Sequence, residues 1–178
     1  MVLTIDIGNT TIGIGGFQGN KLLFIEKISS RRPLSDAGYI EKLNMILNKH
    51  GLSAEAFEGS MISSVVPSVT AVFSSALETF LGRKPLILSH KLDLGYEICT
   101  EFPEKVGCDR LADIAGAISR YSLPFVTIDL GTATTFNVLD ENRRFLGGLI
   151  LPGVGTAHRA LLLSLIHISE PTRRTPIS

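Results

Sequence analysis

Short apolar and alternating segments open the chain, and a turn signal follows each of them. This pattern predicts three consecutive strands at residues 2–6, 11–17 and 21–29. The connections between them are too short for a parallel crossover. We therefore expect the neighbouring strands to run antiparallel.

Segments with helical periodicity then alternate with compact apolar runs. Apolar residues recurring every three or four positions predict helices, and the short apolar runs predict buried strands. The helices are expected at residues 35–51, 67–81 and 109–120, and the strands at 59–66 and 85–89. This succession indicates the α/β class with mixed sheets.

The opening pattern returns after Pro124. Strands are predicted at residues 125–130, 134–139 and 144–151, and a packed helix begins near Pro152. The second series therefore repeats the three-strand pattern of the first, with tight connections that again require antiparallel neighbours.

A short sequence repeat accompanies the repeated strands. Residues 5–11 read IDIGNTT and residues 128–134 read IDLGTAT, each ending an apolar strand with Asp, an aliphatic residue and Gly. We expect a duplicated βββαβα fold with a first domain at 1–117 and a partial second domain at 118–163. The second unit contains only its strands and first helix, so the second domain is expected to be incomplete.

The last fifteen residues, 164–178, do not follow this organisation. SLIHISEPTRRTPIS loses helical periodicity, carries two prolines and resembles translated adaptor sequence, so it is interpreted as a non-native or disordered tail. The chain is accordingly expected to be a fragment. A half-built sheet exposes apolar faces and an unpaired edge, from which we expect aggregation or loss of activity.

Composition excludes several classes of protein. Of 178 residues, 44% are hydrophobic and 19% charged, which suits a packed core rather than disorder. Lys plus Arg and Asp plus Glu balance at 17 each, so the basic excess of nucleic-acid binders is missing. Polar residues interrupt every apolar run before membrane-spanning length, and the N-terminus lacks a cationic signal region. A cytoplasmic protein with no nucleic-acid or membrane partner is expected.

The two Asp-Gly turns have the chemistry of a phosphate site. Gly8 and Gly131 allow close backbone approach, while Asp6 and Asp129 suit a cation or its water shell. Hydroxyl and amide donors surround both turns, namely Asn9, Thr10, Thr11, Thr132, Thr134 and Thr135. No GxxxxGK[ST] sequence is present. Two such turns facing each other would clamp phosphates from both sides.

Two further segments have a functional and a structural interpretation each. In GGLILPG, Gly147 and Gly148 could let a flat ring lie on the backbone, or could simply soften a strand end before a helix. In GCDR, Asp109 could cap the following helix, or act as a general base beside a carboxylate-binding Arg110. Cys108 fits a small apolar filler better than a nucleophile.

In combination, these motifs resemble type III pantothenate kinases of the actin-like sugar kinase, Hsp70 and actin superfamily. The motifs are DIGNT at 6–10, SSVVPSV at 63–69, PEKVGCDR at 103–110, DLGTATT at 129–135 and GGLILPG at 147–153. The resemblance implies an actin-like (ribonuclease H-like) fold and ATP-dependent phosphorylation of pantothenate, the first step of coenzyme A synthesis. It also implies a homodimer that uses Mg²⁺ with ATP and a monovalent cation, K⁺ or NH₄⁺.

The resemblance also assigns roles to residues. Asp109 would be the proton acceptor, Asp129 would ligate the monovalent cation, and Gly107, Cys108, Asp109 and Arg110 would contact pantothenate. The ATP contacts would be Asp6, Ile7, Gly8, Asn9, Thr10, Thr11, Ile12, Gly13, Thr132, Gly147, Gly148, Pro152 and Gly153. Thr100 stands where many members have a substrate-contacting Tyr, and Cys108 replaces the commoner Ala or Ser.

Two alternatives stay open at the level of sequence. The chain could be another kinase or phosphatase of the superfamily, acting on a sugar or polyphosphate. It could also be a regulatory nucleotide-binding module without catalysis. The kinase interpretation requires that Gly8 and Gly131 lie opposite one another with Asp109 beside them.

Overall fold

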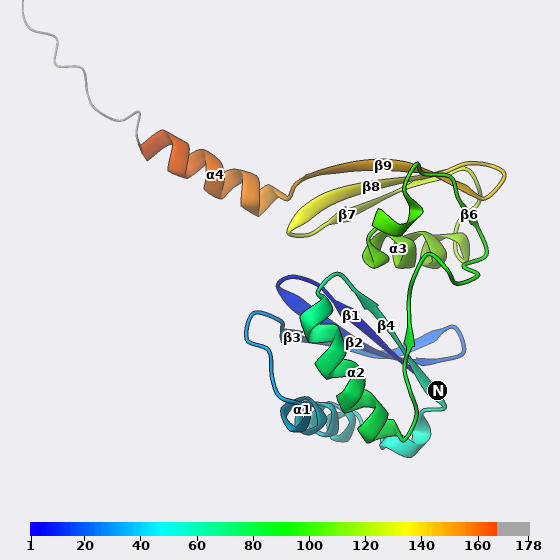
Figure 1. Ribbon diagram of the computed structural model, residues 1–178, viewed down its shortest axis with the longest axis vertical. Coiled ribbons are helices and arrows are strands. Elements are labelled where there is room, and N and C mark those ends of the chain that lie inside the picture. Colours follow the sequence, from blue (N-terminus) through cyan, green and yellow to red (C-terminus); the bar gives the residue numbers. More distant parts are fainter. Residues whose placement is uncertain (167–178) are drawn as a thin grey trace, which may run out of the picture.

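The computed structural model describes residues 1–166 and contains two mixed sheets with four helices (Figure 1). The first sheet has the order β3-β2-β1-β4-β5, in which β1, β2 and β3 form an antiparallel meander and β4 and β5 add parallel strands. Its strands are β1 (Val2–Ile7), β2 (Thr11–Gln18), β3 (Lys21–Ser29), β4 (Gly59–Ser64) and β5 (Leu86–Ile87).

Helices α1 (Asp36–Lys49) and α2 (Pro67–Leu81) pack on the first sheet and on each other. The helices begin as their sequences predict, because Ser35 accepts a hydrogen bond from the Gly38 amide and Pro67 occupies the first turn of α2. Alternate strand residues and the apolar stripes of both helices form one buried core. Its largest fully buried members are Tyr39, Phe73, Leu3, Ile5, Ile7, Ile12, Ile14, Leu43, Leu47, Ile62 and Leu77.

The second sheet has the order β6-β9-β8-β7, with an antiparallel meander of three strands and β6 parallel to β9. Its elements are β6 (Glu97–Ile98), β7 (Phe125–Leu130), β8 (Ala133–Leu139), β9 (Arg144–Pro152), α3 (Cys108–Ile118) and α4 (Val154–Ile166). Short 3-10 turns lie at Ala54–Ala56 and Pro103–Lys105. Helix α3 contacts β7 and β8 of this sheet and also β4 of the first sheet.

The core of the second unit is small. Ile114 of α3 packs there against Leu139 and Phe145 on one face of the sheet. Helix α4 extends away from the sheets in Figure 1, and its leucines Leu161 and Leu163 are exposed. The predicted packed helix therefore forms, but it is not packed along its length. No helix within residues 1–166 combines the length and apolar character needed to cross a membrane.

Most predicted elements form within two or three residues of their expected limits. The two-residue strand β6 was missed, because a pair as short as Glu97–Ile98 has no periodicity to detect. Strand β6 belongs to the second sheet, and helix α3 packs between the two sheets, in contact with β4 of the first and with β7 and β8 of the second. Of the predicted tail 164–178, helix α4 includes the first three residues and the remainder lies outside the described residues.

Candidate active site

The two Asp-Gly turns lie against each other. In each turn the glycine amide donates to a carbonyl shortly after it, Gly8 to Thr11 three positions on and Gly131 to Ala133 two positions on, both at 2.9 Å. The hydroxyl oxygens of Thr10 and Thr132 are 3.4 Å apart, although the residues are 122 positions apart in sequence. The structure therefore brings together the hydroxyl donors that the sequence placed on two separate turns.

The end of the glycine-rich segment joins this pair of turns. The Gly153 amide donates to the Thr132 carbonyl at 3.0 Å, and the Thr156 hydroxyl donates to the same oxygen at 3.0 Å. A Cβ atom at Gly153 would collide with the Gly131 carbonyl oxygen, so only glycine fits here. Pro152 ends β9 immediately before this contact.

Gly147 and Gly148 lie earlier on β9, and they have different reasons to be glycine. Gly147 adopts φ +107°, a backbone conformation that favours glycine. At Gly148, a Cβ atom would collide with the Phe136 carbonyl and lie 2.9 Å from a terminal nitrogen of Arg110. These constraints supply a structural reason for both glycines, independent of any ring bound there.

The segment GCDR forms the start of α3. Gly107 is the N-cap, and Asp109 is the second residue of the helix, so the interpretation of Asp109 as the cap is wrong. The Asp109 Oδ1 atom instead accepts the Arg110 amide at 2.8 Å. The Cys108 thiol donates to the Leu88 carbonyl at 3.1 Å, an inward arrangement that suits a filler.

Arg110 leaves α3 toward the second sheet. Its Nε donates to Asn137 Oδ1 at 2.6 Å, its Nη2 donates to the Phe136 carbonyl at 3.2 Å, and its guanidinium lies 5.4 Å from the Phe145 ring centre. Burial lowers the pKa of Arg110 and the nearby Asp109 carboxylate opposes that effect. The guanidinium is thus held in one position by strand β8.

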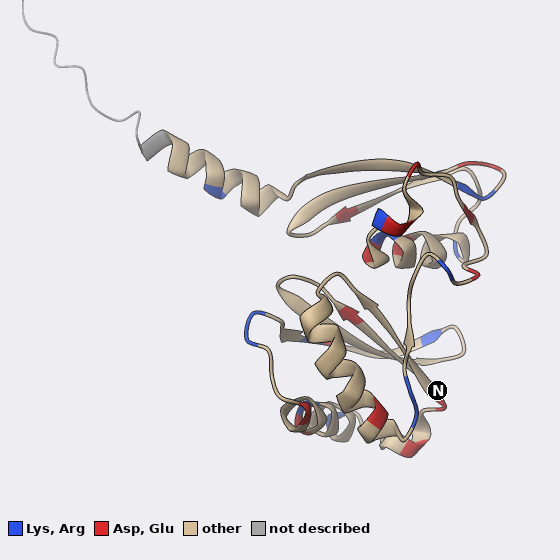
Figure 2. Cartoon of the chain, viewed as in Figure 1, with Lys and Arg blue, Asp and Glu red and all other residues tan. Residues whose placement is uncertain are grey.

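Four carboxylates, Asp6, Asp109, Asp113 and Asp129, lie within electrostatic reach of one another around the turns. Loss of hydration raises the pKa of Asp6, the neighbouring Ser63 hydroxyl opposes the rise, and Asp109 and Asp129 add to it. The Asp6 side chain nevertheless keeps access to solvent at the end of β1. Figure 2 shows acidic positions on α3 and on strands of both sheets. This concentration of negative charge suits the binding of cations.

Asp113 is the member of this group that sequence reasoning missed. Burial, followed by the charges of Asp129, Asp109 and Asp6, raises the pKa of Asp113 to about 6. It lies one helical turn after Asp109, and this i, i+4 spacing was a signal that could have found it. Asp113 and Asp129 line a pocket of about 340 Å³ between α3 and β7.

The carboxylates do not converge on a single point. Within residues 1–166, no three His, Cys, Asp or Glu side chains are arranged to hold a metal ion by themselves. Mg²⁺ in nucleotide sites is usually held by one or two carboxylates, with waters and phosphates completing its shell. The accessible carboxylates of Asp6 and Asp129 at two strand ends fit that kind of binding.

Comparison with known proteins gives consistent matches along the chain. The type III pantothenate kinase family model matches residues 2–175. A type III pantothenate kinase of Thermomicrobium roseum is 37% identical over 161 residues, which are 90% of this chain and 62% of that protein. Another, from Bifidobacterium animalis subsp. lactis, is 38% identical over 170 residues, 96% of this chain and 68% of that protein. The chain thus spans roughly two thirds of the length of these relatives.

Solved structures show a similar fold. A Porphyromonas gingivalis protein described as an N-acetylglucosamine kinase aligns with a TM-score of 0.52 at 17% identity, covering 98% of this chain and 59% of that one. At this identity the likeness concerns the fold alone. The predicted actin-like α/β fold with mixed sheets is confirmed.

Proposed function

Because the chain belongs to the type III pantothenate kinase family, we propose that it transfers a phosphoryl group from ATP to the primary hydroxyl of pantothenate. The observation that carries the proposal is the 3.4 Å contact between Thr10 and Thr132. This contact brings two Asp-Gly-Thr turns together, and Asp109 lies within electrostatic reach of the Asp6 carboxylate that precedes the first of them.

The turns bind the nucleotide in this proposal. Residues 6–13 and Thr132 contact ATP, with backbone amides and threonine hydroxyls directed at its phosphates. The tight contact of Gly153 with the 131–132 turn supports a role for the end of the 147–153 segment beside the nucleotide. The adenosine would lie along Gly147, Gly148, Pro152 and Gly153.

The start of α3 binds pantothenate and receives the proton. Gly107, Cys108 and Arg110 contact the substrate, and the guanidinium of Arg110 pairs with its carboxylate. Asp109 orients the attacking hydroxyl and takes its proton late in the transfer. Since phosphoryl transfer proceeds through a loose transition state, alignment and charge neutralisation supply most of the catalysis.

The carboxylates at the strand ends hold the cations. Asp6 would hold Mg²⁺ or its water shell, and Asp129 would ligate K⁺ or NH₄⁺. When bound, these ions would supply positive charge that offsets the charge of the phosphates. The substitution Asp129→Ala is expected to abolish the dependence of the rate on K⁺, measured by titrating KCl against a constant ionic strength. Continued stimulation by K⁺ in that variant would move the cation site elsewhere.

Membership of the same family supports further proposals about localisation, oligomeric state and partners. The protein acts in the cytoplasm as a homodimer, with pantothenate and ATP as its ligands and without nucleic-acid or membrane partners. Sedimentation equilibrium across a range of concentrations tests the dimer, and a single monomeric mass would refute it.

The direct test of the function is an assay of ADP release with purified protein, ATP, Mg²⁺ and K⁺. In a full-length relative, pantothenate is expected to be consumed with formation of 4′-phosphopantothenate, whereas glucose, N-acetylglucosamine and polyphosphate are not. The 178-residue chain, which spans 62% of the Thermomicrobium roseum protein, is expected to show little or no turnover. Thr10→Val removes the hydroxyl that contacts Thr132, and it should weaken ATP binding by about 10-fold. Turnover of a sugar rather than pantothenate would overturn the proposal.

A further inference from the structure

Asn137 is a polar side chain buried completely in the second sheet. Its exposed fraction is 0%, and it faces α3 from the middle of β8. Its Oδ1 atom accepts from Arg110 Nε at 2.6 Å, and its Nδ2 atom donates to the Thr127 hydroxyl at 3.0 Å. Burying an amide is costly unless it is hydrogen-bonded, so these partners account for its presence in an otherwise apolar region.

Thr127 fixes the direction of the amide. It is the residue directly opposite Asn137 on β7, and its hydroxyl accepts from the amide nitrogen. Because the nitrogen is engaged there, the oxygen faces Arg110. The chain Thr127–Asn137–Arg110 therefore connects the edge strand of the sheet to the first turn of α3.

The bonds to β8 occupy one edge of the Arg110 guanidinium. Nε and Nη2 form the side-on edge, and they donate to Asn137 Oδ1 and the Phe136 carbonyl. Within residues 1–166, the end-on edge, formed by one Nη1 hydrogen and the second Nη2 hydrogen, makes no hydrogen bond to the protein. That edge has the spacing that binds a carboxylate in bidentate fashion.

Gly148 provides the space for this arrangement. A Cβ atom at this position on β9 would lie 2.9 Å from Arg110 Nη2 and would overlap the Phe136 carbonyl, the very group that accepts the Nη2 bond. The Phe145 ring supports the guanidinium from the same strand, 5.4 Å from its centre. Strands β8 and β9 thus provide a site that accommodates the Arg110 guanidinium in one orientation.

We propose that Asn137 is a positioning residue, which holds Arg110 so that its unbonded edge receives the carboxylate of the substrate. This inference rests on the proposed function, because pantothenate supplies the carboxylate. Asn137 does not touch the substrate itself. Asn137 holds Arg110 in one orientation before the substrate arrives, so that less side-chain entropy is lost on binding.

Three variants separate this role from a contribution to folding. Asn137→Leu keeps the branched shape and the number of side-chain heavy atoms, and it removes both hydrogen bonds. Asn137→Asp retains an oxygen for Arg110 but loses the donor to Thr127, and Thr127→Val removes only the outer partner. Circular dichroism and urea unfolding of each variant identify any loss of fold.

The first readout is the Nε–H resonance of Arg110 in the 178-residue chain labelled with ¹⁵N-arginine, assigned by Arg110→Lys. In the unmodified chain we expect slow exchange of this proton with solvent. Slow exchange should persist in Asn137→Asp and Thr127→Val and be lost in Asn137→Leu. Fast exchange in the unmodified chain, or slow exchange in folded Asn137→Leu, would overturn the positioning role.

The second readout is calorimetric binding of pantothenate and of panthenol, in which an alcohol replaces the carboxylate. Asn137→Leu is expected to weaken pantothenate binding by about 10-fold while leaving panthenol unchanged, and Asn137→Asp should lose less. Equal affinity of the unmodified chain and a folded Asn137→Leu for pantothenate would refute the proposal. If the unmodified chain binds neither compound, the proposed function fails, and the Nε–H exchange still decides whether Asn137 positions Arg110.

Discussion

At Asp109, replacing one carboxylate oxygen by an amide nitrogen tests the catalytic role without changing the shape of the side chain. Asparagine has nearly the same shape and keeps an oxygen for the Arg110 amide, but it cannot take a proton. We expect the equivalent of Asp109→Asn in a full-length relative to retain ATP affinity and to lower turnover by ~10²-fold or more. Calorimetry with ATP and the pantothenate assay measure the two quantities. Unchanged turnover would show that another group, or none, accepts the proton.

Asp113 should make the stability of the fold depend on pH. The pKa of this half-buried carboxyl is raised to about 6, so the folded protein holds the proton more tightly than the unfolded chain does. Stability therefore falls as pH rises from the ordinary value of 3.8 to about 6, and stays at the lower level above it. Asp113→Asn removes this cost.

The expected gain for Asp113→Asn is about 1–2 kcal/mol at pH 7.5, after allowance for solvent screening, and almost nothing at pH 4. Urea unfolding at both pH values measures it. Glu78→Gln, an exposed carboxylate on α2, is the matched control and should show no such difference. A loss of stability at pH 7.5 would indicate that the ionised Asp113 has a favourable partner.

The sequence identified the residues of the two turns because glycine, threonine and a strand-terminal aspartate are a local pattern. It could not identify Asn137, which reads as one more polar residue in an alternating strand. Its importance depends on Arg110, 27 positions away, and on the approach of α3 to β8. The residues of the two turns could be predicted from the local sequence, whereas the contact between Asn137 and Arg110 on two different elements could not.

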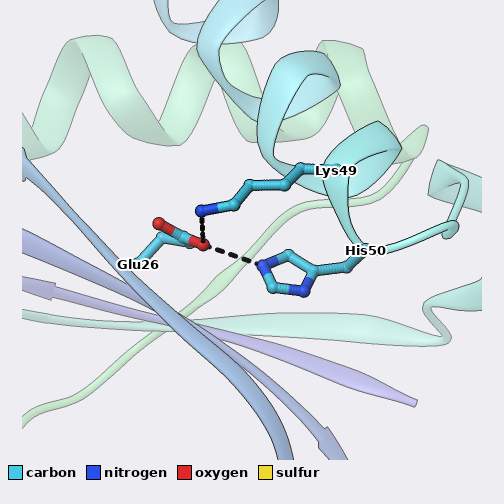
Figure 3. A network of polar contacts seen from close by, with 3 residues as sticks. All are labelled: Glu26, Lys49 and His50. Atoms are coloured by element: carbon cyan, nitrogen blue, oxygen red, sulfur yellow. Dashed lines mark hydrogen bonds and ion pairs between the residues drawn. The ribbon is translucent and has the colours of Figure 1, made fainter.

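At the scale of elements, the end of α1 is anchored to the first sheet through Glu26 (Figure 3). Its carboxylate accepts from Lys49 Nζ at 2.7 Å and lies 2.9 Å from His50 Nε2, and the His50 ring stacks on Phe24 with 4.5 Å between centres. Hydrogen bonds from Lys49 and His50 lower the pKa of Glu26. The folded protein therefore favours the ionised carboxylate.

The anchor predicts a pH-dependent effect of Glu26→Gln. Because the folded pKa lies below the ordinary value, the stabilisation is present above the ordinary pKa of a glutamate and is lost as pH falls through the folded value. We expect Glu26→Gln to lower Tm by no more than a few degrees at pH 7 and by less at pH 3. Thermal unfolding followed by circular dichroism measures this. An equal lowering of Tm at pH 7 and at pH 3 would mean that packing, rather than charge, accounts for the stabilisation.

The three-strand meanders were the most predictable elements, because alternation and turn residues specify each hairpin locally. Strand β6 was not predictable, since Glu97 and Ile98 pair with Arg144 and Phe145, more than forty positions later. The position of α3 relative to the two sheets could not be predicted from the sequence either. Its apolar stripe indicated a buried helix, but nothing in that stripe indicates which of two sheets it covers.

At the scale of the whole molecule, comparison of the two repeats identifies an apolar face of the second sheet that no helix within residues 1–166 covers. By the repeat of residues 5–11 and 128–134, Leu3, Ile5 and Ile7 of β1 correspond to Val126, Ile128 and Leu130 of β7. The first three are 0–1% exposed beneath α1 and α2, whereas the second three are 54%, 56% and 72% exposed. Within residues 1–166, the apolar pattern is therefore repeated, but the helices that cover it in the first sheet have no counterpart on this face.

This uncovered face continues across the second sheet. Cross-strand partners lie on the same face, and the register pairs Ile128 with Phe136 and Phe136 with Leu149. Leu149 and Leu151 are 62% and 47% exposed. An apolar surface of this extent is a site of association in soluble proteins. Burial of such side chains contributes about 1.5–3 kcal/mol each toward association, against the entropic cost of bringing two chains together.

We therefore expect the 178-residue chain to self-associate through this face. Replacing Ile128 and Leu149 by threonine keeps strand propensity and removes apolar area, which should shift the sedimentation profile toward smaller species and reduce binding of the dye ANS. Ile25→Thr is the matched control, because Ile25 on β3 is 60% exposed but lies in the first sheet, outside this face. An equal effect of Ile25→Thr, or an unchanged profile in the double variant, would show that association does not depend on the outer face of β7, β8 and β9.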